Sequence, residues 1–347
     1  MMSDFIPRAL PTGIGSMPHA QTRAALQVMF ENFSTIPYWP QLPKRDFREN
    51  MYAQFSENLV GVQLDLPHEW IGAVIDDHTL AGVETFYARY LEDNPDLFAV
   101  GADYAAGLYA LRDEPAALKH AKWIKGQVTG PISFGLKVVD QILKPMLYDD
   151  TLRDVLVKHI ARKAQWHEKF LRALGTPITF VDEPSLALIG ASVVALNRDE
   201  VIRDLEEVFA GLTGLTGTHC CGNTDWSMLL ATSVHVISFD AYSYAENLAL
   251  FAADVRKFLD RGGVLAWGIV PTVEEQIASE SVESLVARLD AAIHLLVKKG
   301  LDREQLYAQA LVTPACGLGT VSLAAAERAF ALTRGVSEQV RAREGWA

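Results

Sequence analysis

The feature of this chain that most constrains its fold is a repeated alternation of short β-type runs with segments of helical periodicity. Most of the runs precede a stretch in which apolar residues recur at helical spacing. The eight runs are Thr12–Ser16, Leu59–Asp65, Trp123–Thr129, Ile178–Asp182, Leu215–Cys221, His235–Asp240, Val264–Val270 and Ala310–Thr313. Strands that alternate with helices favour a parallel sheet, so the pattern predicts an α/β protein. Eight strand–helix units predict a (β/α)8 TIM barrel, and an open doubly wound sheet is the alternative.

Several helices have clear boundaries in the sequence. The expected helices are Thr151–Leu174, Arg198–Phe209, Glu246–Leu259, Val282–Lys299 and Ser322–Arg343. Gly175 and Gly300 directly follow two of them, where glycine commonly ends a helix. The gaps 17–58 and 66–122 exceed one helix with its loops, so we expect extra helices or a lid after strands 1 and 2. Barrels of this kind commonly have this length, so residues 1–347 are expected to form a single barrel domain.

Charge and cysteine content exclude several classes of protein. The net charge is −12 and the isoelectric point is about 5.2, which argues against nonspecific binding to nucleic acids or acidic membranes. Three cysteines, an odd number, favour thiol or metal chemistry in a reducing compartment over a disulfide scaffold. Residues 1–4 do not begin a signal peptide, and no apolar run has membrane-spanning length. A soluble cytoplasmic protein is therefore expected.

Two short motifs carry the strongest chemical signal. His219 and Cys221 form an H-x-C pair at the end of one expected strand, and Cys316 follows the last expected strand. Residues two apart on a strand point to the same side, so His219 and Cys221 can bind one metal ion while Cys220 points away. Imidazole and thiolate groups are typical zinc ligands, and a catalytic zinc commonly has three protein ligands. Inert, buried cysteines are the alternative interpretation.

Other polar residues also fall where expected barrel strands end. Ser16, Asp182 and Asp240 each close one of the β-type runs, as the H-x-C pair does. Active sites of (β/α)8 barrels lie at the C-terminal ends of the strands. The predicted barrel would therefore gather these side chains at one rim.

Four motifs together resemble those of a known family. Residues 12–18 (T-G-I-G-S-M-P) resemble the I-G-S-x-P segment that opens the catalytic domain of cobalamin-independent methionine synthase, and residues 181–186 (V-D-E-P-S-L) resemble its I-D-E-P-A-L. Residues 219–223 (H-C-C-G-N) resemble the H-x-C zinc motif, with the G-N typical of corrinoid methyltransferases. Residues 314–318 (P-A-C-G-L) resemble the P-D-C-G-L that carries the last zinc cysteine. The motifs span almost the whole chain in the family's order, within a superfamily that includes uroporphyrinogen decarboxylase.

This resemblance assigns Zn2+ to His219, Cys221 and Cys316. Methionine synthase completes its zinc site with a glutamate after the next strand, and Asp240 stands at that place in this chain. The resemblance therefore implies that Asp240 is the fourth ligand or a near neighbour of the metal. A helix-capping or loop-stabilising aspartate is the alternative.

The same resemblance implies a binding site for homocysteine. Ile14 and Ser16 would meet the carboxylate of the amino acid, and Asp182 would hold its ammonium group. Asp65, at the end of the second expected strand, is a further candidate for the ammonium group. A carboxylate bonded to neighbouring loops is the alternative for Asp182, and Glu183 points the other way and is expected to be structural.

Two departures from the family concern the methyl donor. The family carries a histidine after its seventh strand that is used in methyl transfer from folate, whereas residues 267–272 (W-G-I-V-P-T) contain none. The N-terminal half that helps full-length methionine synthases to grip folate is also absent from this sequence. A methylated corrinoid, free or bound to a corrinoid protein, is therefore a candidate donor beside 5-methyltetrahydrofolate.

The motifs predict a zinc-dependent thiol S-methyltransferase that methylates homocysteine to methionine. Zinc would favour the thiolate form of the acceptor, which is the nucleophile. An enzyme similar to uroporphyrinogen decarboxylase is a second hypothesis, although the first strand ends without the arginine that such chemistry uses. A noncatalytic protein that handles zinc or corrinoid is a third hypothesis from a different class.

Overall fold

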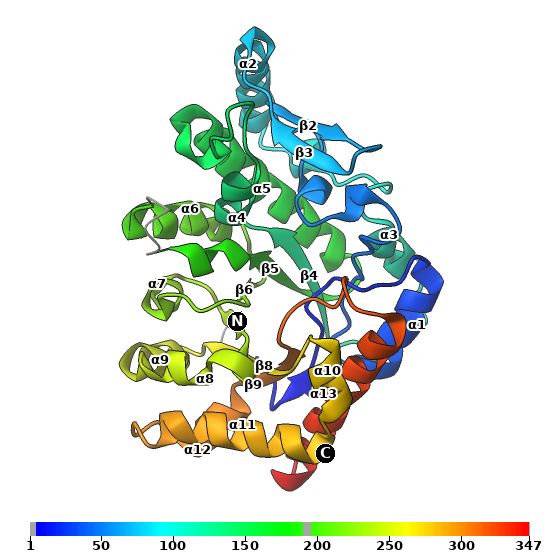
Figure 1. Ribbon diagram of the computed structural model, residues 1–347, viewed down its shortest axis with the longest axis vertical. Coiled ribbons are helices and arrows are strands. Elements are labelled where there is room, and N and C mark those ends of the chain that lie inside the picture. The colour runs from blue at the N-terminus through cyan, green and yellow to red at the C-terminus, as the bar shows by residue number, and fades with distance from the viewer. Residues whose placement is uncertain (1–4, 190–195, 347) are drawn as a thin grey trace.

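The computed structural model describes residues 5–189 and 196–346, so residues 1–4, for which no signal peptide was expected, lie outside the described residues. Its main element is a curled, seven-stranded parallel sheet with the strand order β1-β9-β8-β7-β6-β5-β4 (Figure 1). The strands are β1 (Leu10–Pro11), β4 (Trp123–Thr129), β5 (Thr176–Asp182), β6 (Leu215–Cys220), β7 (Val236–Phe239), β8 (Val264–Val270) and β9 (Ala310–Pro314). The predicted α/β class with a parallel sheet is confirmed.

The prediction for the second strand is wrong. Residues Val62–Asp65 form β2, which pairs antiparallel with β3 (Trp70–Ala73) in a separate two-stranded sheet. This small sheet and helix α2 (Asp77–Leu91) project at one end of the molecule, away from the parallel sheet (Figure 1). The run looked like a barrel strand because its length and composition suit any half-buried strand, and the sequence does not specify the pairing partner.

A different segment, residues 35–42, lies between the two edges of the parallel sheet. Parallel bridges join Tyr38 to Lys125 of β4 and Gln41 to Ser16, which follows β1. The Gln41 amide donates to the Gly15 carbonyl at 3.0 Å, and the Lys125 amide donates to the Pro37 carbonyl at 2.9 Å. The first gap in the predicted pattern therefore supplies backbone to the sheet edges as well as helix α1 (Thr22–Asn32).

Helices cover the outer face of the sheet, and several match their predicted bounds. Those of the described residues that follow α2 are α3 (Ala106–Arg112), α4 (Pro131–Lys137), α5 (Asp150–Arg172), α6 (Arg198–Ala210), α7 (Trp226–Ala231), α8 (Ala241–Ala249), α9 (Ala252–Asp260), α10 (Glu274–Ser279), α11 (Val282–Val297), α12 (Arg303–Ala308) and α13 (Leu323–Arg343). Helix α11 ends two residues before the predicted Lys299, and Gly300 follows it with the left-handed φ of +87°. No described helix combines the length and apolar character needed to cross a bilayer.

One helix expected in the sequence is two helices in the structure. The predicted segment Glu246–Leu259 contains a break at residues 250–251, which separates α8 from α9. The Leu250 side chain is exposed, and the Phe251 backbone has non-helical dihedral angles. The apolar periodicity of the sequence therefore continues although the helix is interrupted. Side-chain periodicity alone does not reveal such a turn.

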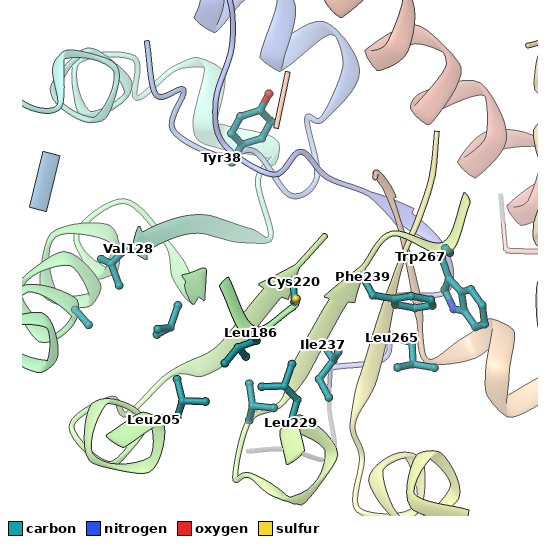
Figure 2. Packing of buried hydrophobic residues seen from close by; sticks show 14 of the residues in the cluster. Tyr38, Val128, Leu186, Leu205, Cys220, Leu229, Ile237, Phe239, Leu265 and Trp267 are labelled. Atoms are coloured by element: carbon teal, nitrogen blue, oxygen red, sulfur yellow. The ribbon is translucent and has the colours of Figure 1, made fainter. Parts of the chain in front are cut away.

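The sheet separates two apolar layers. Between the sheet and its helices lies the larger core, part of which Figure 2 shows around Leu186, Ile237 and Phe239. A smaller cluster lies on the opposite face of the strands and includes Phe180. Its other members are Phe5, Ile36, Trp123, Ile178, Val236, Val264, Ala266 and Leu311. Side chains two positions apart on a strand lie on the same face. The residues two positions beyond this inner cluster therefore lie on the same inner face, nearer the C-terminal ends of the strands.

Candidate metal centre and its cavity

Strand alternation places the H-x-C pair on the inner face of β6. Gly217 packs against the ring of Phe180 in the inner cluster, where a side chain at position 217 would clash. His219 lies two residues further along the same face, and Cys221 follows the end of the strand. Both side chains therefore project from the inner face of the sheet, beyond the inner apolar cluster in the direction of the C-terminal strand ends.

The structure brings His219, Cys221 and Cys316 together. One ligand atom from each residue lies within 4.8 Å of the others. Cys316 comes from the loop directly after β9, so two segments about a hundred residues apart in sequence meet at this point. Of the described His, Cys, Asp and Glu residues, these three form the group whose geometry could hold a metal ion.

The His219 ring is positioned as a metal ligand would be. Its Nδ1 lies 2.9 Å from the Ser238 Oγ of β7, whereas its buried Nε2 has no hydrogen-bond partner. A neutral imidazole that donates from Nδ1 to Ser238 keeps the Nε2 lone pair free for a metal. A buried ring nitrogen without a partner is costly, which makes a bound cation a physically reasonable partner.

The two thiols share a hydrogen bond. The bond from Cys316, together with the nearby His219 imidazole, lowers the pKa of the Cys221 thiol. The same bond and burial raise the pKa of Cys316. One thiolate is therefore favoured in the pair, and thiolates with imidazole are the donor set that suits zinc. The residues present fit a zinc ion.

Cys220 has the opposite orientation, as strand alternation predicted. It is fully buried, and it belongs to the outer apolar core together with Leu186 and Phe239 (Figure 2). Its Sγ lies 3.7 Å from the Gly222 carbonyl oxygen, and burial raises the pKa of the thiol to about 12. Cys220 is therefore a packing residue outside the ligand group.

The three candidate ligand residues line a cavity of about 330 Å3. Ile14, Ser16 and Asp182, which the sequence nominated for substrate binding, line the same cavity. The remaining lining residues are Gln41, Pro43, Glu49, Asn50, Met51, Thr129, Pro184, Gly317, Gly319 and Thr320. The cavity thus joins the ends of several strands with the 17–58 connection.

Asp182 has the features expected of a carboxylate that binds an ammonium group. It ends β5, pairs in register with His219 and is 9% exposed. Its Oδ1 is buried without a hydrogen-bond partner. Burial raises the pKa of Asp182, while the charges of Lys125 and His219 oppose that shift. Glu183, by contrast, accepts the backbone N–H groups of Ile132 and Ser133 at the start of α4, so it is structural as expected.

Asp240 and Asp65 lie outside the group of three candidate ligands, although the Asp240 carboxyl interacts electrostatically with Cys221 and His219. Asp240 caps α8 by accepting the Ser243 amide at 2.8 Å, which is the alternative role that the sequence left open. Asp65 was placed on a barrel strand, but it lies at the end of β2 and its carboxylate is 2.8 Å from the His68 ring. Asp65 is 45% exposed on its side chain and lines a separate surface hollow beside Trp70.

Two groups of residues at the cavity, one in its lining and one outside the lining, were not identified from the sequence. Glu49, Asn50 and Met51 come from the 17–58 connection, which was interpreted only as helices or a lid. Burial raises the pKa of Glu49 to about 7. Lys125 lies below the cavity on β4, where the polar residues of the run W-I-K-G-Q-V-T fall at alternate positions. That alternation was the signal that could have revealed a polar inner face.

No protein-family profile matches the chain, and no curated protein sequence matches it. Among solved structures, the chain is similar to a B12-independent methionine synthase from Shewanella sp. W3-18-1 in complex with selenomethionine. The TM-score is 0.58 and the sequence identity is 15%, with 98% of this chain and 100% of that chain covered. At this level of identity the likeness concerns the fold, which agrees with the parallel sheet described above.

Proposed function

We propose that the protein is a zinc-dependent thiol S-methyltransferase, with homocysteine or a related aminothiol as the acceptor. The observation that carries this proposal is the buried, unpartnered His219 Nε2 beside two thiols at the wall of a cavity. The motif order and the fold of the similar methionine synthase support it. Residues 1–347 would then form one barrel domain, in which residues 35–42 supply the missing eighth position between the sheet edges.

His219, Cys221 and Cys316 would hold the zinc ion. Zinc bound there supplies Lewis-acid stabilisation of an acceptor thiolate at neutral pH. Ser238 keeps the His219 ring in the orientation that leaves Nε2 free. Asp240, as a capping residue near this group, remains a candidate fourth ligand that would have to leave its bond to Ser243.

Asp182, Ile14 and Ser16 would bind the amino-acid part of the acceptor. The Asp182 Oδ1, buried without a partner, suits an ammonium group because a charged hydrogen bond is strong where water is excluded. The Ile14–Ser16 backbone and the Ser16 hydroxyl lie on the same cavity and would meet the carboxylate. Two anchoring points hold the sulfur in one direction, which is the geometry that methyl transfer requires.

The methyl donor would be a methylated corrinoid or 5-methyltetrahydrofolate. Residues 267–272 belong to buried strand β8 and the turn after it, and the segment provides no histidine to the cavity. His19, three residues after Ser16, is buried; its Nε2 lies 3.8 Å from the Glu327 carboxylate, and it does not line the cavity. Both observations support the corrinoid as the better donor.

The decisive experiment is to incubate zinc-loaded protein with homocysteine and either methylcobalamin or 5-methyltetrahydrofolate, and to measure methionine. We expect turnover with at least one donor, and loss of turnover in Cys221→Ser. Stoichiometric zinc without any turnover would favour a noncatalytic zinc-handling protein. Decarboxylation of a porphyrinogen without methyl transfer would favour the decarboxylase hypothesis.

A further inference from the structure

A fully buried lysine lies directly beneath the cavity. Lys125 is 1% exposed, and its Nζ lies 4.4 Å from the centre of the Phe180 ring in the inner apolar cluster. The ammonium group donates to the Ile14 carbonyl at 2.6 Å and to the Gln127 Oε1 at 3.2 Å. No carboxylate of residues 5–189 or 196–346 forms an ion pair with it.

Such a group is expensive for the fold. An ammonium removed from water without a paired anion costs several kcal/mol, and an apolar side chain of the same size would fill this space more favourably. Burial lowers the pKa of Lys125 to about 8, with the charge of Asp182 opposing the shift. A buried cation of this kind therefore points to a role other than stabilising the fold.

One hydrogen bond of Lys125 is made to a residue of the cavity wall, Ile14. Ile14 and Ser16 line the cavity, and the Ile14 carbonyl is the shorter of the two contacts made by the ammonium group. On the other side of this wall, the Leu318 amide donates to the Ser16 carbonyl at 3.0 Å and the Gly319 amide donates to the Ser16 Oγ at 3.3 Å. Residues 14–16 are thus held between β4 and the loop that carries Cys316.

The charges around the cavity give Lys125 a second effect. The lining contains the carboxyl groups of Glu49 and Asp182 and the two thiols, but it contains neither lysine nor arginine. Arg45 pairs with the Glu49 carboxylate at 3.2 Å, whereas Lys125 interacts electrostatically with Asp182. Lys125 therefore offsets the charge of Asp182 without occupying space in the cavity.

We propose that Lys125 is a positioning residue for the acceptor site, which fixes the Ile14–Ser16 wall by its hydrogen bond and offsets the charge of Asp182 by its own charge. This inference rests on the proposed function for the identity of the acceptor. It goes beyond that function because neither the metal ligands nor the residues nominated for the acceptor include Lys125. The role is indirect, since the ammonium group lies behind the wall.

The test uses Lys125→Met, which keeps the length of the side chain and removes its charge and its donor. Lys163→Met is the control, because Lys163 is also fully buried and donates to a backbone carbonyl, that of Ala99 at 3.2 Å. Lys163 differs from Lys125 in that it also lies 4.0 Å from the Glu57 carboxylate. Lys163 belongs to α5 and does not line the cavity. A general effect of removing a buried lysine would appear in both variants.

We expect Lys125→Met to raise the KM for homocysteine at least about tenfold, as the loss of a charge-assisted hydrogen bond implies. Its kcat should change by less than about threefold, and its zinc content should remain that of the wild type. Amide hydrogen exchange at Leu318 and Gly319 should accelerate, because the wall that accepts their hydrogen bonds is released. Lys163→Met should show none of these changes.

Two results would overturn the inference. Unchanged exchange at Leu318 and Gly319 in Lys125→Met would mean that the ammonium group does not fix the wall. Equal losses in both variants would mean that only general stability was affected. If the wild-type protein neither binds nor methylates the thiol, the proposed function fails, and the exchange measurement still decides whether Lys125 fixes the wall.

Discussion

The comparison of two adjacent cysteines tests the metal centre most directly. Cys221→Ser removes a ligand that lies within 4.8 Å of the His219 and Cys316 donor atoms. Cys220→Ser makes the same chemical change one residue earlier, on the face of β6 that packs against the outer core. The two variants therefore separate metal binding from packing at nearly the same place in the chain.

We expect the two substitutions to differ in their effects on zinc affinity and on the free energy of unfolding. Zinc sites with four ligands contribute roughly 10–16 kcal/mol, or about 2.5–4 kcal/mol per ligand. Loss of Cys221 should therefore weaken zinc binding by about 100- to 1,000-fold. Cys220 is fully buried with its nearest acceptor, the Gly222 carbonyl oxygen, at 3.7 Å from Sγ. A hydroxyl there should lower the free energy of unfolding by about 1–3 kcal/mol and leave zinc affinity unchanged.

Zinc affinity would be measured by competition with a chromophoric chelator, and stability by denaturant unfolding of the metal-free proteins. Circular dichroism would confirm that both variants are folded before the affinities are compared. Equal loss of zinc in the two folded variants would refute the assignment of faces on β6. Retention of wild-type affinity in Cys221→Ser would refute the ligand group itself.

Three further predictions concern the surroundings of the metal and the choice of substrates. Ser238→Ala should weaken zinc binding about 10- to 100-fold by releasing the His219 ring, and unchanged affinity in the chelator competition would show that the hydrogen bond is dispensable. Asp182→Asn should cost about 3–5 kcal/mol of acceptor binding, measured by calorimetry, with little change in zinc content; unchanged acceptor affinity would remove Asp182 from the site. Methylcobalamin should support faster turnover than 5-methyltetrahydrofolate in parallel assays with one thiol, and transfer from folate alone would contradict the argument from residues 267–272.

Local patterns in the sequence were sufficient for most of the sheet and for the three residues that could hold a metal ion. The predicted bounds of β4 and β8 coincide with the structure, and α6, α11 and α13 begin within one residue of their predicted starts. His219 and Cys221 could be assigned to one face because side chains alternate along a strand regardless of what surrounds it. The parallel sheet then brought Cys316 to them, because the ends of parallel strands meet at one edge.

Only the tertiary structure decided the features that depend on which segments pair. Residues 59–65 have the composition of a strand, but residues 62–65 pair with β3, and residues 35–42 lie at the edges of the parallel sheet instead. Because of that pairing, Asp65 lies away from the predicted site. Glu49 lines the cavity, and Lys125 contacts the cavity wall at Ile14, through contacts between distant parts of the chain. The periodicity of a sequence indicates which face of a helix or strand is buried. Strand pairing and buried charge depend on the balance of desolvation and hydrogen bonding in the assembled fold, which no local pattern contains.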